Sequence, residues 1–492
     1  MTTYTFVTGS PREVAAGLLV VPVFEGPEPG PGAKETRTFE AYMGARLTGK
    51  KGETLLVPKR RGDRFAADAV LLVGVGPKDA FDVTALRRTI GRVAGSARRF
   101  GTVATTFPMA LGVRHAGEAV QAAAEGLALG SYRFERYRSK PEGDGPLKAI
   151  MVVGSSRWDQ KAAKVALKRA EVIVDAVCWA RDLVNTPAGD LPPAAIAREA
   201  QAMARSVGLT CKVWTEPQLK QGGFGGILGV GRGSANPPRM IELTYAGAGR
   251  AKPLALTGKG IAFDSGGLSI KPADGVETVK CDMGGAASIL ATMKVLARLK
   301  PKINVIAVIP SSENMPSGTA QKPGDVIRHR GGTTSEVLNT DAEGRLILAD
   351  ALAYLIEKKP QLIVDTATLT GACMVALGSD ITGAMGNDDA LIQEIVDAGA
   401  LVGEPTWQLP LHHDYRPLID SKVADVKNIG KRYGGAITAA LFLAEFVGDT
   451  PWCHLDIAGP AFADGAHDLG PAGGTGVPVR TLVRFVLDRA GG

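Results

Sequence analysis

Three charged residues, Asp341, Glu343 and Arg345, stand at alternate positions in the stretch NTDAEGRLILADAL, which spans residues 339–352. The apolar residues that follow them have the spacing of a buried helix. Acidic residues are common where a helix begins, because its first N–H groups carry partial positive charge. The two carboxylates therefore have two interpretations, as caps of this helix or as part of a chemical site.

A second stretch carries charges of both signs. The segment GKGIAFDSGGLSIKP, at residues 258–272, contains Lys259, Asp264 and Lys271 among glycines and serines. Further along, CDMGGAAS places Asp282 at the expected start of a helix. Charged side chains in loops that follow strands are available for chemistry, so this stretch is the second candidate.

The two stretches together supply four carboxylates, those of Asp264, Asp282, Asp341 and Glu343. Carboxylates that converge on one point repel strongly unless cations lie between them. Two divalent ions roughly 3.5–4 Å apart can share a carboxylate and hold a water-derived nucleophile. A two-metal site is therefore one prediction. Caps at the helix starts remain the alternative for three of the four residues.

Other sequence motifs were weighed against the metal site. A lysine in a glycine-rich loop is also typical of phosphate binding, but GKG at 258–260 lacks the G-x-x-x-x-G-K-[ST] pattern. The chain has no G-x-S-x-G or HExxH motif, which argues against serine hydrolases and zincins. The six histidines lie outside both stretches and are expected to be structural or at the surface. A two-metal phosphoesterase remains an alternative enzyme.

The order of apolar and helical patterns predicts an α/β fold. Alternation of strands and helices indicates a mostly parallel sheet flanked by helices, and ligands of such sheets gather beyond the carboxyl ends of the strands. In the second half of the chain, strands are expected at 209–214, 240–246, 253–260, 303–310 and 361–368, and helices at 285–299, 344–358, 389–400, 435–447 and 475–488.

The length of 492 residues is sufficient for two domains. Apolar runs at 69–76 and 147–155 predict buried strands of a smaller N-terminal α/β domain, residues 1–160. A helical pattern at 159–185 ends before a cluster of prolines, and residues 161–190 are expected to link the domains. The larger C-terminal domain, residues 191–492, contains both charged stretches and is expected to be catalytic.

Composition limits the class and the compartment. Hydrophobic residues make up 45% of the chain, but no apolar run is long enough to span a membrane. The first residues lack the charged start and apolar core of a signal peptide. The five cysteines are odd in number and form no CxxC pair, which favours reduced thiols. A cytoplasmic protein without membrane partners is expected.

The net charge is +7, and basic residues cluster at 58–64, 87–99 and 132–140. A solvated basic surface is the simpler interpretation of these clusters. Because all three fall in the first third of the chain, a DNA-binding role of the N-terminal domain is a second hypothesis. Few aromatic residues accompany the clusters and no nucleic-acid motif is present, so this signal is weak.

The charged stretches resemble the leucine aminopeptidase (cytosol aminopeptidase) family. The similarity rests on GKGIAFDSGGLSIKP, the Asp282 segment and NTDAEGRLILADAL, and it extends to RDLVNTPAGDLPP (181–193), VDTATLTGA (364–372), GGAITAALFLAEF (434–446) and WCHLDIAGPA (452–461). It covers roughly residues 180 to 485, whereas the first 160 residues match only by size and place. The combination of NTDAEGRL with KGIAFDSGG is highly specific.

The resemblance implies a set of metal ligands. Asp264 and Glu343 would bridge two divalent ions, Lys259 and Asp282 would complete one coordination sphere, and Asp341 would complete the other. A lysine binds metal only as a neutral amine, so the pKa of Lys259 must be strongly depressed, as burial and nearby cations both favour. Oxygen ligands with one nitrogen suit Mn²⁺, Zn²⁺ or Mg²⁺.

The resemblance also implies a catalytic pair, Lys271 and Arg345, neither of which binds metal. A fixed ammonium at Lys271 would stabilise the oxyanion that forms at the scissile carbonyl. Arg345 is too basic to accept a proton itself. In the family this arginine holds a bicarbonate ion that shuttles the proton, and a planar guanidinium grips such an anion well.

The family further implies substrate and assembly. Its members remove single amino acids, often leucine, from peptide N-termini, and they are typically homohexamers whose active sites face an interior cavity. One position departs from the family pattern: Val279 stands where a methionine usually lines the pocket for the first side chain. A change of this size shifts selectivity by about 1–3 kcal/mol, so the preference for leucine is left open.

Overall fold

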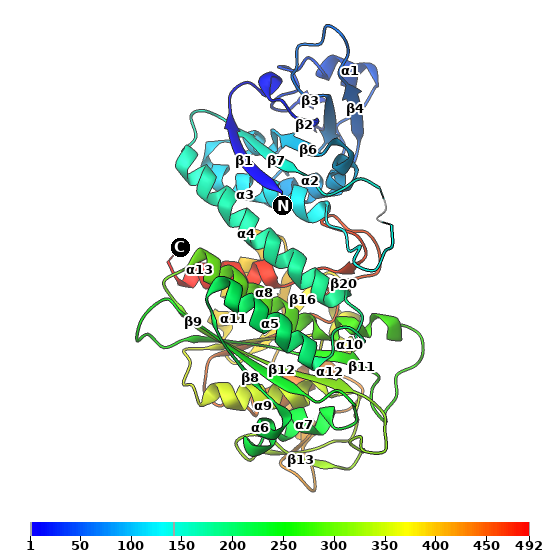
Figure 1. The fold of residues 1–492 in the computed structure, drawn as a ribbon, viewed down its shortest axis with the longest axis vertical. Coiled ribbons are helices and arrows are strands. Elements are labelled where there is room, and N and C mark those ends of the chain that lie inside the picture. The colour runs from blue at the N-terminus through cyan, green and yellow to red at the C-terminus, as the bar shows by residue number, and fades with distance from the viewer. Residues whose placement is uncertain (1, 141–142, 492) are drawn as a thin grey trace. The chain divides into compact units, whose positions relative to one another are not determined.

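The computed structural model describes residues 2–140 and 143–491, and it divides the chain into two compact units. The first unit comprises Met1–Cys178 and the returning segment Gly465–Ala472, and the second comprises Trp179–Asp464 and Gly473–Gly492. Figure 1 shows that each unit contains a sheet with helices packed against it. The predicted two-domain α/β architecture with mostly parallel sheets is confirmed.

The first unit is built on a seven-stranded sheet. Its strands are parallel except β4 and β3, because β4 pairs antiparallel with β5 and β3 with β2. Every residue of β2 is buried, as expected for an apolar strand in the middle of a sheet. In spatial order the strands are β1 (Thr3–Thr8), β7 (Ala149–Gly154), β6 (Thr102–Thr105), β2 (Leu18–Phe24), β5 (Ala69–Gly74) and β4 (Thr54–Pro58), with β3 (Glu28–Pro29) beside β2.

Among the described residues, three α-helices lie wholly within this unit: α1 (Phe39–Gly44), α2 (Val83–Ala97) and α3 (Ala116–Gly130). Helices α2 and α3 pack closely because glycines face each other: a Cβ on Gly130 would lie 2.2 Å from the carbonyl oxygen of Gly91. The two predicted strands at 69–76 and 147–155 are β5 and β7. The predicted helix at 159–185 is α4 (Gln160–Asn185).

The second unit contains a nine-stranded sheet whose centre is parallel. Strands β19, β15, β10 and β12 run side by side in the same direction, and β11 pairs parallel with the far half of β12. In spatial order the sheet contains β17 (Thr406–Gln408), β16 (Thr382–Gly386), β19 (Trp452–Asp456), β15 (Ile363–Ala367), β10 (Leu254–Gly258), β12 (Asn304–Asn314), β9 (Arg239–Ala246) and β8 (Thr210–Trp214), with β11 (Gly260–Asp264) beside β12.

Helices cover both faces of this sheet. Helices α5, α8, α11 and α13 lie on one face and α7 and α9 on the other (Figure 1). Both α8 and α9 are apolar almost all round and almost entirely buried, as befits helices inside a layered core. Their bounds are α5 (Pro193–Val207), α6 (Glu216–Gln221), α7 (Gly225–Gly231), α8 (Gly284–Leu299), α9 (Gly344–Ile356), α10 (Gly371–Leu377), α11 (Asp389–Val402), α12 (Gly435–Ala444) and α13 (Val479–Arg489).

Some element boundaries, and the placement of Asp282, differ from the sequence-based prediction. The strand expected at 253–260 ends at Gly258, and a new strand, β11, begins at Gly260; β10 pairs with both β12 and β15, whereas β11 pairs with β12. The strand expected at 303–310 continues to Asn314. Helix α13 begins at Val479, since Gly476 has a positive φ and Pro478 follows it. Asp282 lies in the 3₁₀ helix η5 (Val276–Met283) rather than at the start of α8.

A small three-stranded sheet completes the surroundings of the site. It consists of β13 (Val326–Arg328), β14 (Thr334–Glu336) and β18 (Val426–Lys427), and a further pair is formed by β20 (Phe462–Ala463) and β21 (Gly473–Gly474). Among the residues that the structure describes, no helix is long and apolar enough to cross a membrane. All five cysteines are free thiols.

Candidate active site

The charged residues of the two stretches meet at the carboxyl ends of the central parallel strands. Lys259 directly follows β10, Asp264 is the last residue of β11, and Thr368 follows β15. Because β10, β12 and β15 run parallel, the loops that leave them emerge at the same edge of the sheet. Residues far apart in the sequence are therefore brought together at this edge.

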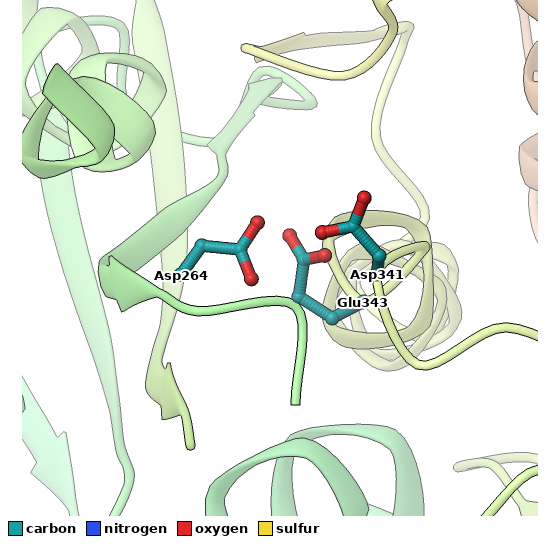
Figure 2. A group of neighbouring side chains, drawn as sticks. All are labelled: Asp264, Asp341 and Glu343. Atoms are coloured by element: carbon teal, nitrogen blue, oxygen red, sulfur yellow. The ribbon is translucent and has the colours of Figure 1, made fainter. Parts of the chain in front are cut away.

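Three of the predicted residues, Asp264, Asp341 and Glu343, form a compact cluster (Figure 2). One oxygen from each lies within 4.8 Å of the others, which is close enough for all three to hold a metal ion. Asp264 comes from β11, whereas the other two precede α9. Asp264 and Glu343 are buried, and Asp341 is partly exposed. Three carboxylates so placed require positive charge between or beside them.

Lys259 supplies part of the positive charge that the three carboxylates require. Its Nζ lies 2.8 Å from Oδ1 of Asp282 and 2.7 Å from Oε1 of Glu343, and it donates a hydrogen bond to the carbonyl of Thr368 at 2.9 Å. The lysine is only 4% exposed. Helix α9 must start with glycine here, because a Cβ on Gly344 would lie 2.6 Å from Cδ of Lys259.

Lys271 supplies further positive charge to the cluster. Its Nζ lies 2.8 Å from Oδ2 of Asp264 and forms an ion pair with Asp341. The side chain is one quarter exposed, so this ammonium, unlike that of Lys259, is reached by solvent. The two lysines thus lie among four carboxylates, and the cluster keeps an excess of negative groups.

Arg345 lies in the first turn of α9 and is 7% exposed. Its Nη1 donates a hydrogen bond of 2.8 Å to the carbonyl of Asn428. Its Nε is buried and has no hydrogen-bond partner among the described residues. Burial lowers the pKa of Arg345 to about 10, so the guanidinium remains protonated at neutral pH. A buried, protonated donor without a partner is suited to an anion.

The helix-cap interpretation is wrong for Glu343 and Asp282. Glu343 occupies the cap position of α9, but its side chain accepts no hydrogen bond from that helix. Asp282 accepts a hydrogen bond of 2.7 Å from the hydroxyl of Thr368 instead, and its second oxygen is buried without a partner in the described part of the chain. Because these carboxylates accept no hydrogen bond from the adjacent helix, their oxygens are available to bind a metal ion.

Burial and like charge disturb the ionisation of the cluster. Burial, followed by the nearby carboxylate of Asp264, raises the pKa of Glu343 to about 8. Burial also raises the pKa of Asp282 and of Asp341. These shifts show that the protein cannot hold every carboxylate ionised without additional cations. The cluster therefore has the electrostatics of a metal centre.

The pKa of Lys259 departs from the sequence-based expectation. Burial lowers it, as anticipated, but the carboxylates of Asp282 and Glu343 outweigh burial, and the net pKa is raised. The protein alone therefore keeps this amine protonated. The pKa of Lys271 is likewise raised, because Asp264 outweighs burial. Only cations placed among the carboxylates would reverse the shift at Lys259.

Sequence reasoning missed the residues that hold the carboxylates in place. Asn314, the last residue of β12, donates hydrogen bonds to Oδ1 of Asp264 at 2.8 Å and to the carbonyl of Thr340 at 2.9 Å. Thr340 in turn donates to the carbonyl of Gly266 at 2.6 Å. These bonds tie the loop after β11 to the loop before α9. A polar residue at the end of a buried strand was the available signal.

Asn428 was also missed, and it clamps the second loop. Its side-chain oxygen accepts from the N–H of Leu338 at 2.9 Å, and its amide donates to the carbonyl of Asn339 at 2.6 Å. Its own carbonyl holds Arg345. Asn428 has no exposed surface. One residue therefore fixes both the loop that carries Asp341 and the arginine beside it.

The cluster forms the floor of a cavity of about 440 Å³, within the size range of small-molecule sites. Six of the seven predicted residues line the cavity, while Glu343 lies behind Lys259. Val279 belongs to the wall, as the sequence suggested. The other lining residues include Thr278, Cys281, Asn339, Ala342, Thr368, Leu369, Thr370, Gly371, Ile429, Gly430, Lys431, Arg432, Gly435, Thr438 and Ala458.

The basic clusters of the first unit are partly engaged within that unit. Arg87 forms a buried ion pair with Glu125 at 2.8 Å, and Arg92 pairs with Asp468 at 2.5 Å. Arg98 is buried and donates to the carbonyl of Gly145. These side chains stabilise the unit rather than present charge to a partner, so the segment at 87–99 carries less free charge than its composition indicates.

Two histidines are core residues. His454 is fully buried and lies 2.6 Å from Asp365, and His329 lies 2.7 Å from the hydroxyl of Ser335. Asp350 faces the other nitrogen of His329 at 3.3 Å, which resembles a serine-hydrolase triad. All three of these side chains are buried, so the arrangement is structural.

Comparison with known families extends the picture to the whole chain. The model of the cytosol aminopeptidase family catalytic domain matches residues 178–483, and that of its N-terminal domain matches residues 20–141. The probable cytosol aminopeptidase of Streptomyces griseus is 45% identical, with 100% of this chain and 99% of that protein covered. That of Rhodococcus jostii is 44% identical, with 92% and 89% covered.

Solved structures give the same result. The bottromycin maturation enzyme BotP in complex with Mn superposes with a TM-score of 0.86 at 37% identity, covering 97% of this chain and 100% of that one. A variant of tomato leucine aminopeptidase superposes with a TM-score of 0.88 at 32% identity, covering 99% and 97%. The two domain models match in order, and the similarity runs along the whole chain. This protein therefore belongs to the cytosol aminopeptidase family of metallopeptidases and is an aminopeptidase.

Proposed function

We propose that this aminopeptidase works with two divalent ions held among the four carboxylates. Asp264 and Glu343 would serve both ions, Lys259 and Asp282 would hold one of them, and Asp341 would hold the other. The observation that carries the proposal is the excess of buried negative groups, including an oxygen of Asp282 that has no partner among the described residues. When bound, such ions supply a water molecule of lowered pKa as a nucleophile at neutral pH.

Lys271 is proposed to stabilise the oxyanion of the scissile carbonyl. Its ammonium is held beside the cluster by Asp264 and Asp341 and is partly exposed to the cavity. Its raised pKa keeps it charged at neutral pH. A preorganised cation at the place where negative charge develops lowers the activation barrier. Lys259, buried and bonded to Thr368, is placed for the metal instead.

Arg345 is proposed to hold a bicarbonate ion. The unpartnered Nε and the fixed Nη1 support this proposal, because they leave a charged donor directed at the cavity wall. Bicarbonate at this position supplies a group that accepts and returns a proton. The arginine keeps its charge and orients the anion, and Asn428 orients the arginine.

The position of the cluster accounts for cleavage at the peptide end. Lys259 and Asp282 line the cavity and are only 4% and 8% exposed, which supports entry of the peptide by one terminus. The proposed substrates are peptides with a free N-terminus and an apolar first residue such as leucine. Val279 lines the wall and is proposed to set how large that residue is. Membership of a peptidase family leaves the phosphoesterase alternative without support.

Hydrolysis of leucine p-nitroanilide by the full-length protein tests this function. The protein is stripped with a chelator and then given Mn²⁺, Zn²⁺ or Mg²⁺ separately; manganese is expected to restore activity, as it is the metal bound in the BotP complex. N-acetyl-leucine p-nitroanilide is the matched control, and it should not be cleaved. Full activity after verified metal removal, or equal cleavage of the acetylated substrate, would contradict the proposal.

A homohexamer in the cytoplasm is the proposed setting. Large apolar side chains on the catalytic unit, Val375, Trp407 and Tyr433, are 91%, 64% and 82% exposed, which supports burial against further copies of the chain. Five free thiols suit a reducing compartment. Light scattering after size-exclusion chromatography measures the assembly directly, and a monomer at micromolar concentration would contradict it.

A further inference from the structure

Two cations at the entrance of the catalytic cavity have no role in the chemistry described so far. Lys431 and Arg432 line the cavity in the loop between β18 and α12, and both are exposed. No hydrogen bond or ion pair within the described residues involves either side chain. We call these two residues the cationic rim.

The rim differs from the cations of the floor. Lys259 faces Asp282 and Glu343, and Lys271 faces Asp264 and Asp341. Every carboxylate that lines the cavity is therefore already paired with a lysine of the floor. The rim has no such partner among the described residues. A ligand that brings a negative group to the entrance would be complementary to this charge.

The start of α12 adds to the positive potential. This helix of ten residues begins at Gly435, which lines the cavity, and its cap residue, Gly434, offers no side chain to the free N–H groups. The first N–H groups of a helix carry partial positive charge. The rim and this helix end belong to one continuous loop, so their fields act on the same region.

We propose that the cationic rim binds a carboxylate carried by the second residue of the substrate. This inference rests on the aminopeptidase function, because it places the scissile bond at the floor and the residue after it at the entrance. The second residue offers a carboxylate in two ways, as the C-terminus of a dipeptide or as an aspartate or glutamate side chain. A dipeptide spans roughly 7 Å, and flexible lysine and arginine side chains can reach its end.

The test compares substrates that differ only in this charge. The kcat/KM values of the manganese-loaded protein are measured for Leu-Gly and Leu-Gly-amide, and for Leu-Asp-amide and Leu-Asn-amide. We expect the charged member to be preferred by about tenfold in at least one pair, as one charge-assisted hydrogen bond allows. The first pair reports the terminal carboxylate and the second the side chain. The preference should fall as salt is raised.

Variants show whether the rim is responsible. In the double variant Lys431→Ala and Arg432→Ala the preference should fall to near one, chiefly through a higher KM for the charged substrate. Replacing both residues by glutamate, Lys431→Glu with Arg432→Glu, should reverse it. Lys422→Ala is the matched control, because Lys422 is exposed in the same region but does not line the cavity; it should leave the preference unchanged.

Two results would overturn the inference: charged and neutral substrates cleaved equally by the native protein, or a preference that survives in the double variant. Both leave the aminopeptidase function intact, since leucine p-nitroanilide, which carries no carboxylate, reports that function separately. Failure to cleave any of these substrates, leucine p-nitroanilide included, would remove the proposed function and this inference with it.

Discussion

Buried charges occur in both units of the molecule, but they are arranged differently. In the first unit Arg87 pairs with Glu125, the two side chains are 4% and 1% exposed, and Gln121 donates to the remaining carboxylate oxygen at 2.8 Å. A similar matched pair in the second unit joins Arg480 to Glu404. Each of these pairs sets one buried positive charge against one buried negative charge, which is what a buried ion pair needs to be tolerated.

The catalytic cluster breaks that balance. Two lysines lie among four carboxylates, and one oxygen of Asp282 stays without a partner in the described residues. Glu343 is as buried as Glu125, at 1% exposed, yet its pKa is raised to about 8 by burial and by Asp264. The contrast teaches that structural charges are matched within the protein, whereas functional ones are left in excess for ions that bind later.

A substitution at Glu343, in the unmatched cluster, should have the greatest effect on hydrolysis. Glu343→Gln keeps the shape of the side chain and removes a carboxylate ligand, so we expect loss of measurable hydrolysis and of metal binding. The free energy of unfolding of the metal-free variant should not fall at neutral pH, because a pKa of about 8 leaves most of the Glu343 carboxyl protonated before the substitution. Leucine p-nitroanilide assays, metal analysis and urea unfolding measure the three quantities. Retained activity would contradict the assignment of Glu343.

Glutamate-to-glutamine substitution at Glu125, in the matched pair, should lower the stability of the protein and not its hydrolytic activity. Glu125→Gln leaves Arg87 buried without its counter-charge, and removing one partner of a buried pair costs about 3–5 kcal/mol. We expect the free energy of unfolding to fall by that amount while the folded protein keeps its hydrolytic activity. If Glu125→Gln and Glu343→Gln behaved alike, the distinction between matched and unmatched charges would be wrong.

Lys271→Ala distinguishes a catalytic group of the cluster from its proposed metal ligands. It removes the proposed oxyanion stabiliser and should lower kcat by about 10²–10³-fold. Metal content should stay near that of the native protein, because this lysine is not a proposed ligand. Steady-state kinetics and metal analysis of the same sample check both statements. Loss of the metal together with the activity would give Lys271 a structural role instead.

Asn428→Ala tests how the cluster is held. Residues that position metal ligands typically contribute 10–100-fold in activity or metal affinity, and we expect a loss in that range. Asn304 is the matched control, because its amide also clamps a loop, at 2.9 Å from the carbonyl of Gly249 and 2.7 Å from that of Ala251. Asn304→Ala should lower stability and leave the manganese affinity unchanged. If the two variants changed the manganese affinity equally, Asn428 would have no specific role in positioning the metal ligands.

The smallest expected effect concerns the pocket wall. Val279→Met introduces a longer side chain into the cavity and should favour smaller first residues. A change of this size is worth about 1–3 kcal/mol in selectivity. The ratio of kcat/KM for phenylalanine p-nitroanilide to that for alanine p-nitroanilide should therefore fall by roughly tenfold, and an unchanged ratio would place Val279 outside the first-residue pocket.

The sequence carried the charged residues and most of the elements that position them. Lys259, Asp264 and Asp341 stood out because charges in loops beside apolar strands have few structural reasons to be there. The alternation of strands and helices was visible from periodicity alone. The seven predicted residues do lie together, and six line one cavity. Their roles as metal ligands and catalytic groups remain predictions.

Several features that were not predicted from the sequence depend on contacts between segments far apart in the chain. Asn314 and Asn428 look like ordinary polar residues in the sequence, and only the folded chain brings them to Asp264 and Arg345. The break between β10 and β11 falls where the pairing with β15 ends while the pairing with β12 continues, which periodicity does not report. Helix α13 begins late because of the local backbone at Gly476 and Pro478. The return of residues 465–472 to the first unit also has no local signal.

If the excess of buried carboxylates holds two ions that catalysis needs, activity must depend on the number of ions bound. The most direct measurement is a manganese titration of the metal-free protein, following bound metal per chain by equilibrium dialysis and leucine p-nitroanilide hydrolysis in the same samples. The account predicts that binding saturates near two ions per chain and that activity rises as the second site fills. Full activity with one ion per chain, or with none, would contradict it.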